Sequence, residues 1–332
     1  MQKKNPAKRR PERLVVTLLS LLFLSTAVFA TVKYVFRAPE LDTDKPVVTP
    51  DGTASTDADR PDAPGRTRRK YCYNILVSGL DDDNGGSDTN ILVRFDVPNK
   101  RINLVSLPRD TLLHNEYRNN KLNFAYAKGG TELLMEQIEN LLGVPVDFYV
   151  TVNLKGFIAL VDQIDGVDFD IPINMDYDDP YQDLHIHFTK GPRHLNGQEA
   201  MEVVRFRHNN DGTGYGTEDI GRIGTQQAFL KAVAKQLLQI GNVKNIPALV
   251  DIFYTYVKTD LTTGNLVWLG NEALNIGTEN IHFATLPGDG SGYYNKQSVY
   301  VLDAQATCDL VNEALNPYNE ALTLEDMDIL VP

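Results

Sequence analysis

The sequence predicts a three-layer α/β/α sandwich with a central mixed β-sheet, preceded by one transmembrane helix. Strand-like runs alternate with helical segments from Tyr71 onward, which is typical of helices packed on a sheet. Hydrophobic residues make up 42% of the chain and charged residues 23%, as expected for a globular core. The 332 residues therefore suit one sizeable α/β domain behind an N-terminal segment.

The N-terminal segment predicts the compartment of the domain. Residues 14–32 form an almost unbroken apolar run, and at about 1.5 Å per residue this run can cross a hydrocarbon core of about 30 Å. Basic residues at 3–13 precede it, so the positive-inside rule keeps the N-terminus cytoplasmic. We expect a cytoplasmic tail at 1–13 and a signal-anchor at 14–36, giving a single-pass protein of the cell membrane whose domain is extracytoplasmic. A signal peptide cleaved near 28–30 is the alternative, and it also exports the domain.

Residues 37–70 are predicted to be a disordered linker, because they are rich in Pro, Asp, Thr and Ala and lack apolar periodicity. The basic end of this linker, 66–70, either contacts anionic lipid headgroups or lies in solvent. The folded domain then covers 71–332. Residues 1–37 carry a net charge of +7, which leaves −19 on the remainder of a chain whose net charge is −12. Such an acidic body repels nucleic acid, so any anionic ligand needs a local basic pocket.

Alternating β-branched and aromatic runs and helical apolar stripes locate the elements of the domain. Strands are predicted at 73–80, 90–97, 101–107, 146–152, 167–171 and 281–286. Helices are predicted at 131–142, 156–164, 197–204, 219–240, 246–255, 263–276 and 303–315. The second and third strands form a hairpin around Pro98, and Thr131 caps the first helix after two glycines.

Four carboxylates crowd the loop after the first strand: Asp81, Asp82, Asp83 and Asp88. Carboxylates on a loop at a strand end suit a hard cation such as Mg²⁺, which prefers oxygen ligands. Asp88 is the best individual candidate because a β-branched strand directly follows it and gives it a rigid base. A solvated acidic turn is the alternative.

Two basic residues are placed where α/β sheets bind ligands. Arg109 follows the strand 101–107, and Pro108 holds the preceding residue extended, so Arg109 stands at a carboxyl edge of the sheet. A structural pair between Arg109 and Asp110 is the alternative. Lys121 lies two residues before Asn123, so in an extended segment both face one side, where Lys121 can neutralise a phosphate.

A second group of cations lies later in the chain. Arg205 and Arg207 share a face of an extended segment, and their guanidinium groups match phosphate oxygens in a bidentate way. Salt bridges to the surplus carboxylates are the alternative. Arg222 and Gln226 lie one turn apart near the start of a helix that Asp219 is expected to cap. A cation near the positive end of a helix is unfavourable without an anion, which indicates a phosphate beside Arg222.

Several other patterns are absent or inconclusive. The sequence has no P-loop, no dinucleotide-binding glycine motif, no HExxH, no CxxC and no nucleophile elbow. His185 and His187 form a strand-type pair without obvious partners, and we interpret them as a surface feature rather than a zinc site. In an oxidising compartment Cys72 and Cys308 either form a disulfide or remain as two buried thiols.

Taken together, the acidic loop and the cations describe a diphosphate site. Catalysis at such a site needs positioning and charge neutralisation, with little covalent work by the protein. An enzyme outside the cytoplasm has no ATP supply, so an activated lipid diphosphate is the natural donor.

The chain resembles the LytR-CpsA-Psr family of cell-wall glycopolymer ligases from about residue 71 to 238. Nine motifs occur in the family's order, and together they are very specific. They are Gly-x-Asp at 79–81, Ser-Asp-Thr at 87–89, Leu-Pro-Arg-Asp at 107–110, Lys-x-Asn-x-Ala-Tyr at 121–126, Gly-Gly at 129–130, an Asp that precedes Gly-Val at 162–167, Leu-x-Gly-x-x-Ala at 195–200, Arg-x-Arg-His at 205–208, and Asp-x-x-Arg with Gln-Gln at 219–227.

The resemblance implies a phosphotransferase that moves a glycopolymer, such as a wall teichoic acid or capsule, from undecaprenyl diphosphate onto a peptidoglycan sugar hydroxyl. It implies Mg²⁺ at Asp81 and Asp88, with Asp81, Asp88 and Arg109 as catalytic residues and one of the two acids as the base. It implies that the diphosphate is held by Arg109, Lys121, Arg205, Arg207, Arg222 and Gln226. The lipid chain would enter an apolar groove between sheet and helices.

The sequence departs from the family pattern at Thr225, where the family often has another arginine. The acidic loop is also short, and 209–218 inserts Gly and Tyr residues. These departures affect the grip on the phosphates. A non-catalytic polyprenyl-phosphate binder and a lipid diphosphate hydrolase are the alternative functions.

Overall fold

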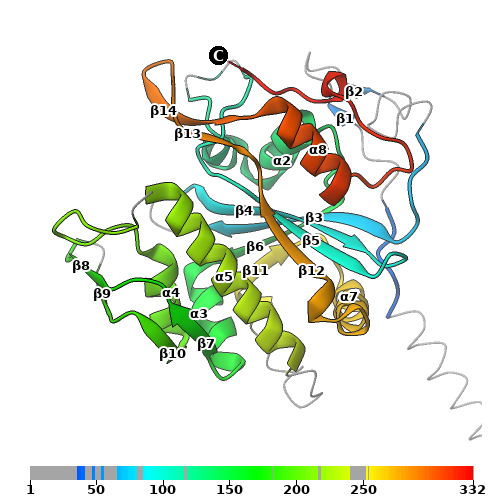
Figure 1. The fold of residues 1–332 in the computed structure, drawn as a ribbon. Helices are drawn as coiled ribbons and strands as arrows, with labels where there is room; N and C mark the ends of the chain where they lie inside the picture. Colours follow the sequence, from blue (N-terminus) through cyan, green and yellow to red (C-terminus); the bar gives the residue numbers. More distant parts are fainter. Residues whose placement is uncertain are drawn as a thin grey trace, which may run out of the picture.

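A mixed six-stranded sheet forms the centre of the molecule (Figure 1). The computed structural model describes residues 36–41, 47–48, 54–55, 66–80, 85–115, 117, 119–181, 183–215, 218–239, 252 and 254–331. The order of strands in the sheet is β11 (Val257–Thr259), β6 (Phe148–Asn153), β3 (Cys72–Leu80), β4 (Ser87–Asp96), β5 (Arg101–Leu107) and β12 (Ile281–Thr285). Outside the sheet lie the short elements β1 (Val47–Val48), β2 (Ala54–Ser55), η3 (Thr278–Asn280) and η4 (Leu324–Asp326).

The pairing of these strands brings several loop ends to one edge. β3 runs parallel to β6, and β5 runs parallel to β12, whereas β4 is antiparallel to both β3 and β5. The start of β4 therefore lies at the same edge as the carboxyl ends of β3, β5, β6 and β12. This arrangement confirms the predicted mixed sheet and the predicted hairpin between β4 and β5.

Alternating side chains of the sheet pack against helices on both faces. Leu76 and Leu92 belong to one core together with α2 and α8, whereas Ile75 and Phe95 belong to another core with α7. These helices are α2 (Leu122–Leu142), α7 (Thr263–Ile276) and α8 (Ala304–Ala314). Figure 1 shows α2 and α8 on one side of the sheet and α7 on the other.

A separate hydrophobic core holds the part of the molecule that contains three helices and four short strands. These elements are α3 (Leu154–Gln163), β7 (Val167–Ile171), β8 (Met175–Asp179), β9 (Leu184–Phe188), β10 (Gly191–Leu195), α4 (Gly197–Arg205) and α5 (Glu218–Gln239). Phe206 and Phe229 are fully buried in this core, and the ring of Phe169 lies 5.4 Å from that of Phe229. Gln227 on α5 donates a hydrogen bond to Thr285 on β12, which connects this part to the sheet (2.5 Å).

Most predicted elements are confirmed, but two hairpins and the strands β10 and β11 were not predicted, and several element boundaries differ from the prediction. The hairpins pair β8 with β9, and β13 (Gly288–Tyr294) with β14 (Gln297–Leu302). The helix predicted at 131–142 begins earlier, at Leu122, with a kink at Gly129 and Gly130. The long helix begins at Glu218, so the cap predicted at Asp219 is wrong. The helix predicted at 246–255 lies largely outside the described residues.

The basic segment 66–70, predicted as the end of a disordered linker, packs against the domain. The backbone of Arg68 forms an isolated antiparallel β-bridge with that of Tyr318. The Arg68 guanidinium lies 2.5 Å from the Asp147 carboxylate. Arg69 forms an ion pair with the buried Asp96 at 3.1 Å. These arginines therefore bind the domain's own carboxylates.

The predicted membrane span, 14–36, lies outside the described residues apart from Phe36. Among the helices that the structure does describe, none combines the length and the apolar character needed to cross a bilayer.

Both cysteines are buried thiols, so the disulfide alternative is wrong. Cys308 lies near the middle of α8, and its sulfur is 3.6 Å from the carbonyl oxygen of Leu322 in the C-terminal segment. Cys72 begins β3 and is fully buried. Burial raises the pKa of Cys72 to about 11, with a further contribution from Asp96.

Candidate active site

The predicted catalytic residues Asp88 and Arg109 meet at the sheet edge. Asp88 is the second residue of β4, and Arg109 follows the end of β5 by two residues. Because β4 and β5 are antiparallel, with Asn90 opposite Leu107, the two side chains reach each other. Arg109 Nη1 donates a hydrogen bond to Asp88 Oδ1 at 2.6 Å. The structure therefore brings one predicted metal ligand and one predicted phosphate ligand into contact.

Asp110 and Lys121 extend this pair into a row of alternating charges. Lys121 Nζ lies 3.1 Å from Asp110 Oδ1, and Arg109 Nε lies 3.8 Å from Asp110 Oδ2. The four side chains are 20–42% exposed. Partial shielding from water strengthens their electrostatic interactions, while their exposure leaves them open to a ligand. We call Asp88, Arg109, Asp110 and Lys121 the edge cluster.

A small cavity of about 50 Å³ opens beside the edge cluster. Asp88, Arg109 and Asp110 line it together with Gln226 of α5 and Tyr300 of β14. A cavity of this size holds a few waters or part of a phosphate group, not a lipid chain. Its size and its charged lining therefore fit the charged end of a ligand better than an apolar chain.

The backbone of the Arg109 segment is fixed on both sides. Tyr300 donates its backbone N–H to the Asp110 carbonyl at 2.8 Å and accepts from Leu112 at 2.9 Å. On the other side, the Asn123 N–H donates to the Arg109 carbonyl at 2.9 Å. These bonds position Arg109 before any ligand arrives, as electrostatic catalysis requires.

The role of β14 was missed at the sequence level, although a signal was present. Asn295 and Lys296 both adopt positive φ, at 46° and 64°, which is the geometry of a two-residue hairpin turn. The β-branched and aromatic run at 298–302 follows them. The sequence signal was Asn295, a residue type that favours such turns, directly before this run, and it would have indicated the hairpin that carries Tyr300 to the cavity.

Lys121 and Asn123 do not share one extended face, so that prediction is wrong. Lys121 itself is extended, with φ −94° and ψ 145°, but it caps α2 and Asn123 already lies inside the helix. Lys121 nevertheless reaches the edge cluster through Asp110.

Gln226 connects the cavity to the end of α4. Its Nε2 donates to the Val204 carbonyl at 3.2 Å, directly before Arg205. Arg205 is half-buried, Phe206 is fully buried, and Arg207 is exposed. The backbone that leads into Arg205 and Arg207 thus lies beside Gln226, which lines the cavity.

Two predicted site residues cannot be placed from the described residues. Asp81 lies outside them, and only the backbone of Arg222 within α5 is described. Thr225, the departure from the family pattern, is 6% exposed, and its hydroxyl donates to the Gly221 carbonyl at 3.0 Å. Its hydroxyl is thus satisfied within the helix, and the position adds no cation to the cavity.

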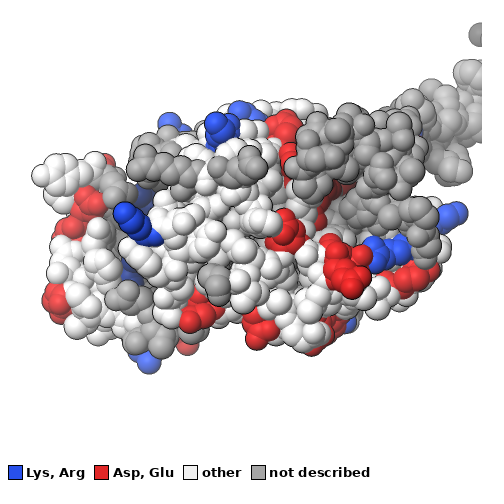
Figure 2. Space-filling view, turned by 90° about the horizontal axis from the view of Figure 1, so that it is seen from above, with Lys and Arg blue, Asp and Glu red and all other residues white. Residues whose placement is uncertain are grey.

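Charged side chains of both signs lie on the described part of the surface (Figure 2). On the face shown in Figure 2, acidic side chains are scattered widely and basic side chains occur singly or in small groups. The edge cluster sets two cations against two carboxylates at the mouth of a cavity, on a chain whose net charge is −12.

The edge cluster, the sheet topology and the order of motifs all suggest one family, and comparison with family models decides it. Residues 47–316 match the model of the LytR-CpsA-Psr family. The chain belongs to the LytR-CpsA-Psr family. The match extends well beyond the 71–238 segment on which the resemblance rested, and it includes the β13–β14 hairpin.

Two similar proteins from Bacillus species are named as teichoic acid transferases. The chain is 31% identical to the polyisoprenyl-teichoic acid–peptidoglycan teichoic acid transferase TagV of Bacillus subtilis over 252 residues, covering 72% of this chain but only 62% of TagV. It is 32% identical to the corresponding transferase TagU of Bacillus cereus over 244 residues, covering 72% of this chain and 76% of TagU.

Solved structures share the fold. The crystal structure of B. subtilis TagV superimposes with a TM-score of 0.63 at 26% identity, covering 79% of this chain and all of that chain. A structure described as TagT bound to LI-WTA superimposes with a TM-score of 0.58 at 23% identity, covering 76% of this chain and 92% of that chain. The second likeness concerns the fold alone.

The described donors at the sheet edge fit the Mg²⁺ ion that the family implies. Asp88 offers a partly exposed carboxylate on the rigid start of β4, and the Asp110 carboxylate lies in the same cavity. Carboxylate oxygens are the ligands that Mg²⁺ prefers, and the open cavity leaves room for the waters it retains.

Proposed function

We propose that this protein transfers a glycopolymer from undecaprenyl diphosphate onto a sugar hydroxyl of peptidoglycan. The observation that carries the proposal is the edge cluster, in which Arg109 and Lys121 stand beside Asp88 at the mouth of a cavity. Guanidinium and ammonium groups hold diphosphate oxygens, and a neighbouring carboxylate can accept a proton. Similarity to TagV and TagU, both named as teichoic acid transferases, supports the same reaction class.

In the proposed reaction, Arg109 and Lys121 hold the diphosphate with Gln226, joined by Arg205, Arg207 and Arg222. The acceptor hydroxyl attacks the phosphorus that carries the glycopolymer, and the bond from that phosphorus to the bridging oxygen breaks. Undecaprenyl phosphate leaves with the bridging oxygen. Asp88, or Asp81 on the preceding loop, accepts the hydroxyl proton.

The two cations have separate tasks in this scheme. In the structure the Arg109 guanidinium donates a hydrogen bond to Asp88. A bound diphosphate would therefore compete with that carboxylate for the guanidinium. Once the guanidinium turns toward phosphate oxygens, the Asp88 carboxylate is released from Arg109 and can face Mg²⁺ or the acceptor hydroxyl. Lys121 balances the charge of Asp110 and adds positive charge at the leaving phosphate.

Asp81 and Asp88 would hold Mg²⁺, which supplies neutralisation of the diphosphate charge. The polyprenyl chain keeps the substrate in the membrane, and the segment 14–36 would anchor the protein there as a signal-anchor with its domain outside the cytoplasm.

The proposal is tested with the full chain in detergent micelles, Mg²⁺, a polyprenyl-diphosphate-linked glycan and purified peptidoglycan. Mass spectrometry of muramidase-digested product should find the glycan attached to a peptidoglycan sugar through a phosphodiester. Free phosphorylated glycan without attachment would indicate a hydrolase instead. Binding of the lipid without turnover would indicate a non-catalytic binder.

A further inference from the structure

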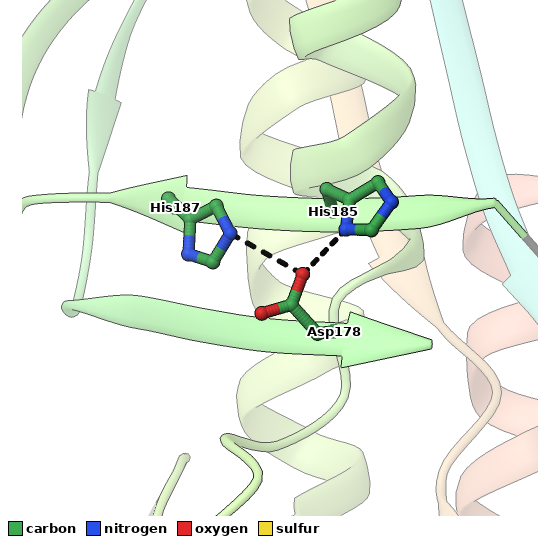
Figure 3. Close-up of side chains that lie close together, drawn as sticks. All are labelled: Asp178, His185 and His187. Atoms are coloured by element: carbon green, nitrogen blue, oxygen red, sulfur yellow. Dashed lines mark hydrogen bonds and ion pairs between the residues drawn. The ribbon is translucent and has the colours of Figure 1, made fainter. Parts of the chain in front are cut away.

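The β8–β9 hairpin carries a cluster of imidazoles and carboxylates on its outer face. Antiparallel pairing sets His185 opposite Asp178 and His187 opposite Asp176. The alternate residues of β9, such as Ile186, point inward and are buried in the core with Phe206. The histidines and aspartates therefore share one exposed face, as Figure 3 shows for three of them.

Three ligand atoms converge in this cluster. Asp178 Oδ1 lies 2.5 Å from His185 Nδ1 and 3.4 Å from His187 Nε2. One ligand atom from each of the three residues lies within 4.8 Å of the other two. Ligands of a tetrahedral zinc ion lie about 3.3–3.5 Å apart, given metal–ligand distances of about 2.0–2.2 Å. The exposed His185 ring needs to move outward by only about 1 Å to admit such an ion.

The far nitrogen of each imidazole faces a further carboxylate. Asp176 Oδ1 lies 2.8 Å from His187 Nδ1, and Asp183 Oδ1 lies 3.7 Å from His185 Nε2. Asp176 can accept the Nδ1–H of His187, which leaves the Nε2 lone pair of that ring on the side of Asp178. Asp183 lies beyond hydrogen-bond distance of His185 Nε2, but its charge favours a proton there when a metal ion takes the Nδ1 of His185. This carboxylate–histidine pairing is the arrangement that orients metal-ligating histidines in proteins.

Hydrogen bonds to the loop after α4 also hold the backbone of β8. The Asn209 side-chain oxygen accepts from the Asp176 N–H at 2.7 Å, and the Asn210 side-chain oxygen accepts from the Asp178 N–H at 3.1 Å. The two carboxylates thus rise from a backbone held on both edges of β8, by β9 and by this loop. A rigid base of this kind preorganises a ligand set.

We propose that Asp178, His185 and His187 form a binding site for one divalent transition-metal ion of the zinc class, with water completing a tetrahedron. Two imidazole nitrogens favour zinc over Mg²⁺ or Ca²⁺, which prefer oxygen ligands. Hydrogen bonds to Asp178 and Asp176 raise the pKa of His185 and His187, so a metal ion must displace the protons that these carboxylates hold on the rings. With the rings deprotonated, the carboxylates of Asp176, Asp178 and Asp183 leave a surplus of negative charge that a dication offsets. The site is separate from the edge cluster and does not depend on the proposed transferase activity.

His194 supplies a matched control within the same part of the molecule. Its Nδ1 lies 2.7 Å from Asp168 Oδ1, across the β7–β10 pair, so it is also an exposed histidine opposite an aspartate. It belongs to no three-ligand group among the residues that the structure describes. A histidine–aspartate pair alone therefore exists on this surface as a built-in comparison.

The test is calorimetric titration of the full chain in detergent with zinc chloride, purified through an affinity tag that contains no histidine. We expect saturable binding of one ion per chain, weakened about 100-fold or more by His185→Gln or His187→Gln and about 10- to 100-fold by Asp176→Asn. His194→Gln should bind zinc as the unmodified chain does, and the thermal midpoints of all variants should agree because the side chains are exposed.

Three results would overturn the site. One is the absence of saturable binding at millimolar zinc in the unmodified chain. Another is equal affinity in the His185→Gln and His187→Gln variants, which would place the ion elsewhere. The third is displacement of the zinc by millimolar Mg²⁺, which would contradict a site built on imidazole nitrogens.

Discussion

The edge cluster and the β8–β9 hairpin both set carboxylates beside nitrogen groups, but the nitrogens differ. At the sheet edge they belong to Arg109 and Lys121, which are permanently charged and carry no lone pair for a metal. On the hairpin they belong to His185 and His187, which offer a lone pair when neutral. The comparison teaches that the type of nitrogen, more than the count of charges, separates an oxyanion site from a metal site.

The side chains of the edge cluster are also more buried than those of the β8–β9 hairpin. The side chains of the edge cluster are 20–42% exposed and line a cavity at the end of the central sheet. The side chains of Asp178, Asp183 and His185 are 46–101% exposed and lie on the outer face of the β8–β9 hairpin. A cavity suits a substrate that must be positioned and partly shielded from water, whereas a surface hairpin suits an ion that is bound but does no chemistry on a large substrate.

The largest effect should come from removing the guanidinium at the sheet edge. Arg109→Ala leaves Asp88 without its donor and removes a cation from the cavity, so glycan transfer should fall by about 100-fold or more. Initial rates of attachment to peptidoglycan measure this loss. Arg101→Ala is the control, because Arg101 forms an exposed ion pair with Glu313 at 3.2 Å on the far end of β5. Equal rates for the two variants would remove Arg109 from the site.

A crossed experiment tests whether the two clusters are independent. His187→Gln should weaken zinc binding at least about tenfold and leave glycan transfer within about twofold, since it touches only the hairpin. Arg109→Ala should do the reverse. Zinc affinity and transfer rate are measured on both variants. Loss of transfer in His187→Gln would show that the hairpin belongs to the active site.

The packing beneath the hairpin predicts an effect on stability. A Cβ added at Gly197 would lie 2.2 Å from the Ile158 carbonyl oxygen, where α3 and α4 approach closely. Gly197→Ala should therefore lower the free energy of unfolding by about 1–3 kcal/mol. Gly224→Ala on α5 meets nothing within 4 Å and should raise it by up to about 1 kcal/mol. Urea unfolding distinguishes the two, and equal midpoints would contradict the close approach.

The smallest measured signal, the labelling of thiols in the folded chain, is expected at Cys72 and Cys308. Burial raises the pKa of both thiols, so at pH 8 they remain protonated and shielded. A thiol-reactive maleimide should label neither Cys72 nor Cys308 in the folded chain, and both after unfolding without reductant. Unfolded protein that stays unlabelled would indicate a disulfide.

The sequence predicted the central sheet well because its strands carry strong local patterns. The β-branched runs of β3, β4 and β5 and the turn at Pro98 specify the hairpin without distant information. The motif Leu-Pro-Arg-Asp likewise placed Arg109 correctly at a strand end. Local pattern sufficed there, because helices cover both faces of these strands and favour apolar residues along them.

What could not be predicted depends on contacts between distant segments. Nothing near His185 in sequence shows that Asp178 lies opposite it, because the register of β8 and β9 is set across a turn. Arg68 and Arg69 looked like solvated linker residues because their partners, Asp147 and Asp96, lie far along the chain. Asn123 was assigned, together with Lys121, to an extended segment because the kink at Gly129 hid the true start of α2.

The central claim is that the edge cluster binds a polyprenyl diphosphate, and native mass spectrometry of the full chain tests it most directly. Protein released from detergent micelles containing undecaprenyl diphosphate should carry one lipid molecule, and Arg109→Ala should lose most of it while Arg101→Ala retains it. Equal retention of the lipid by both variants, or none by the unmodified chain, would contradict the account.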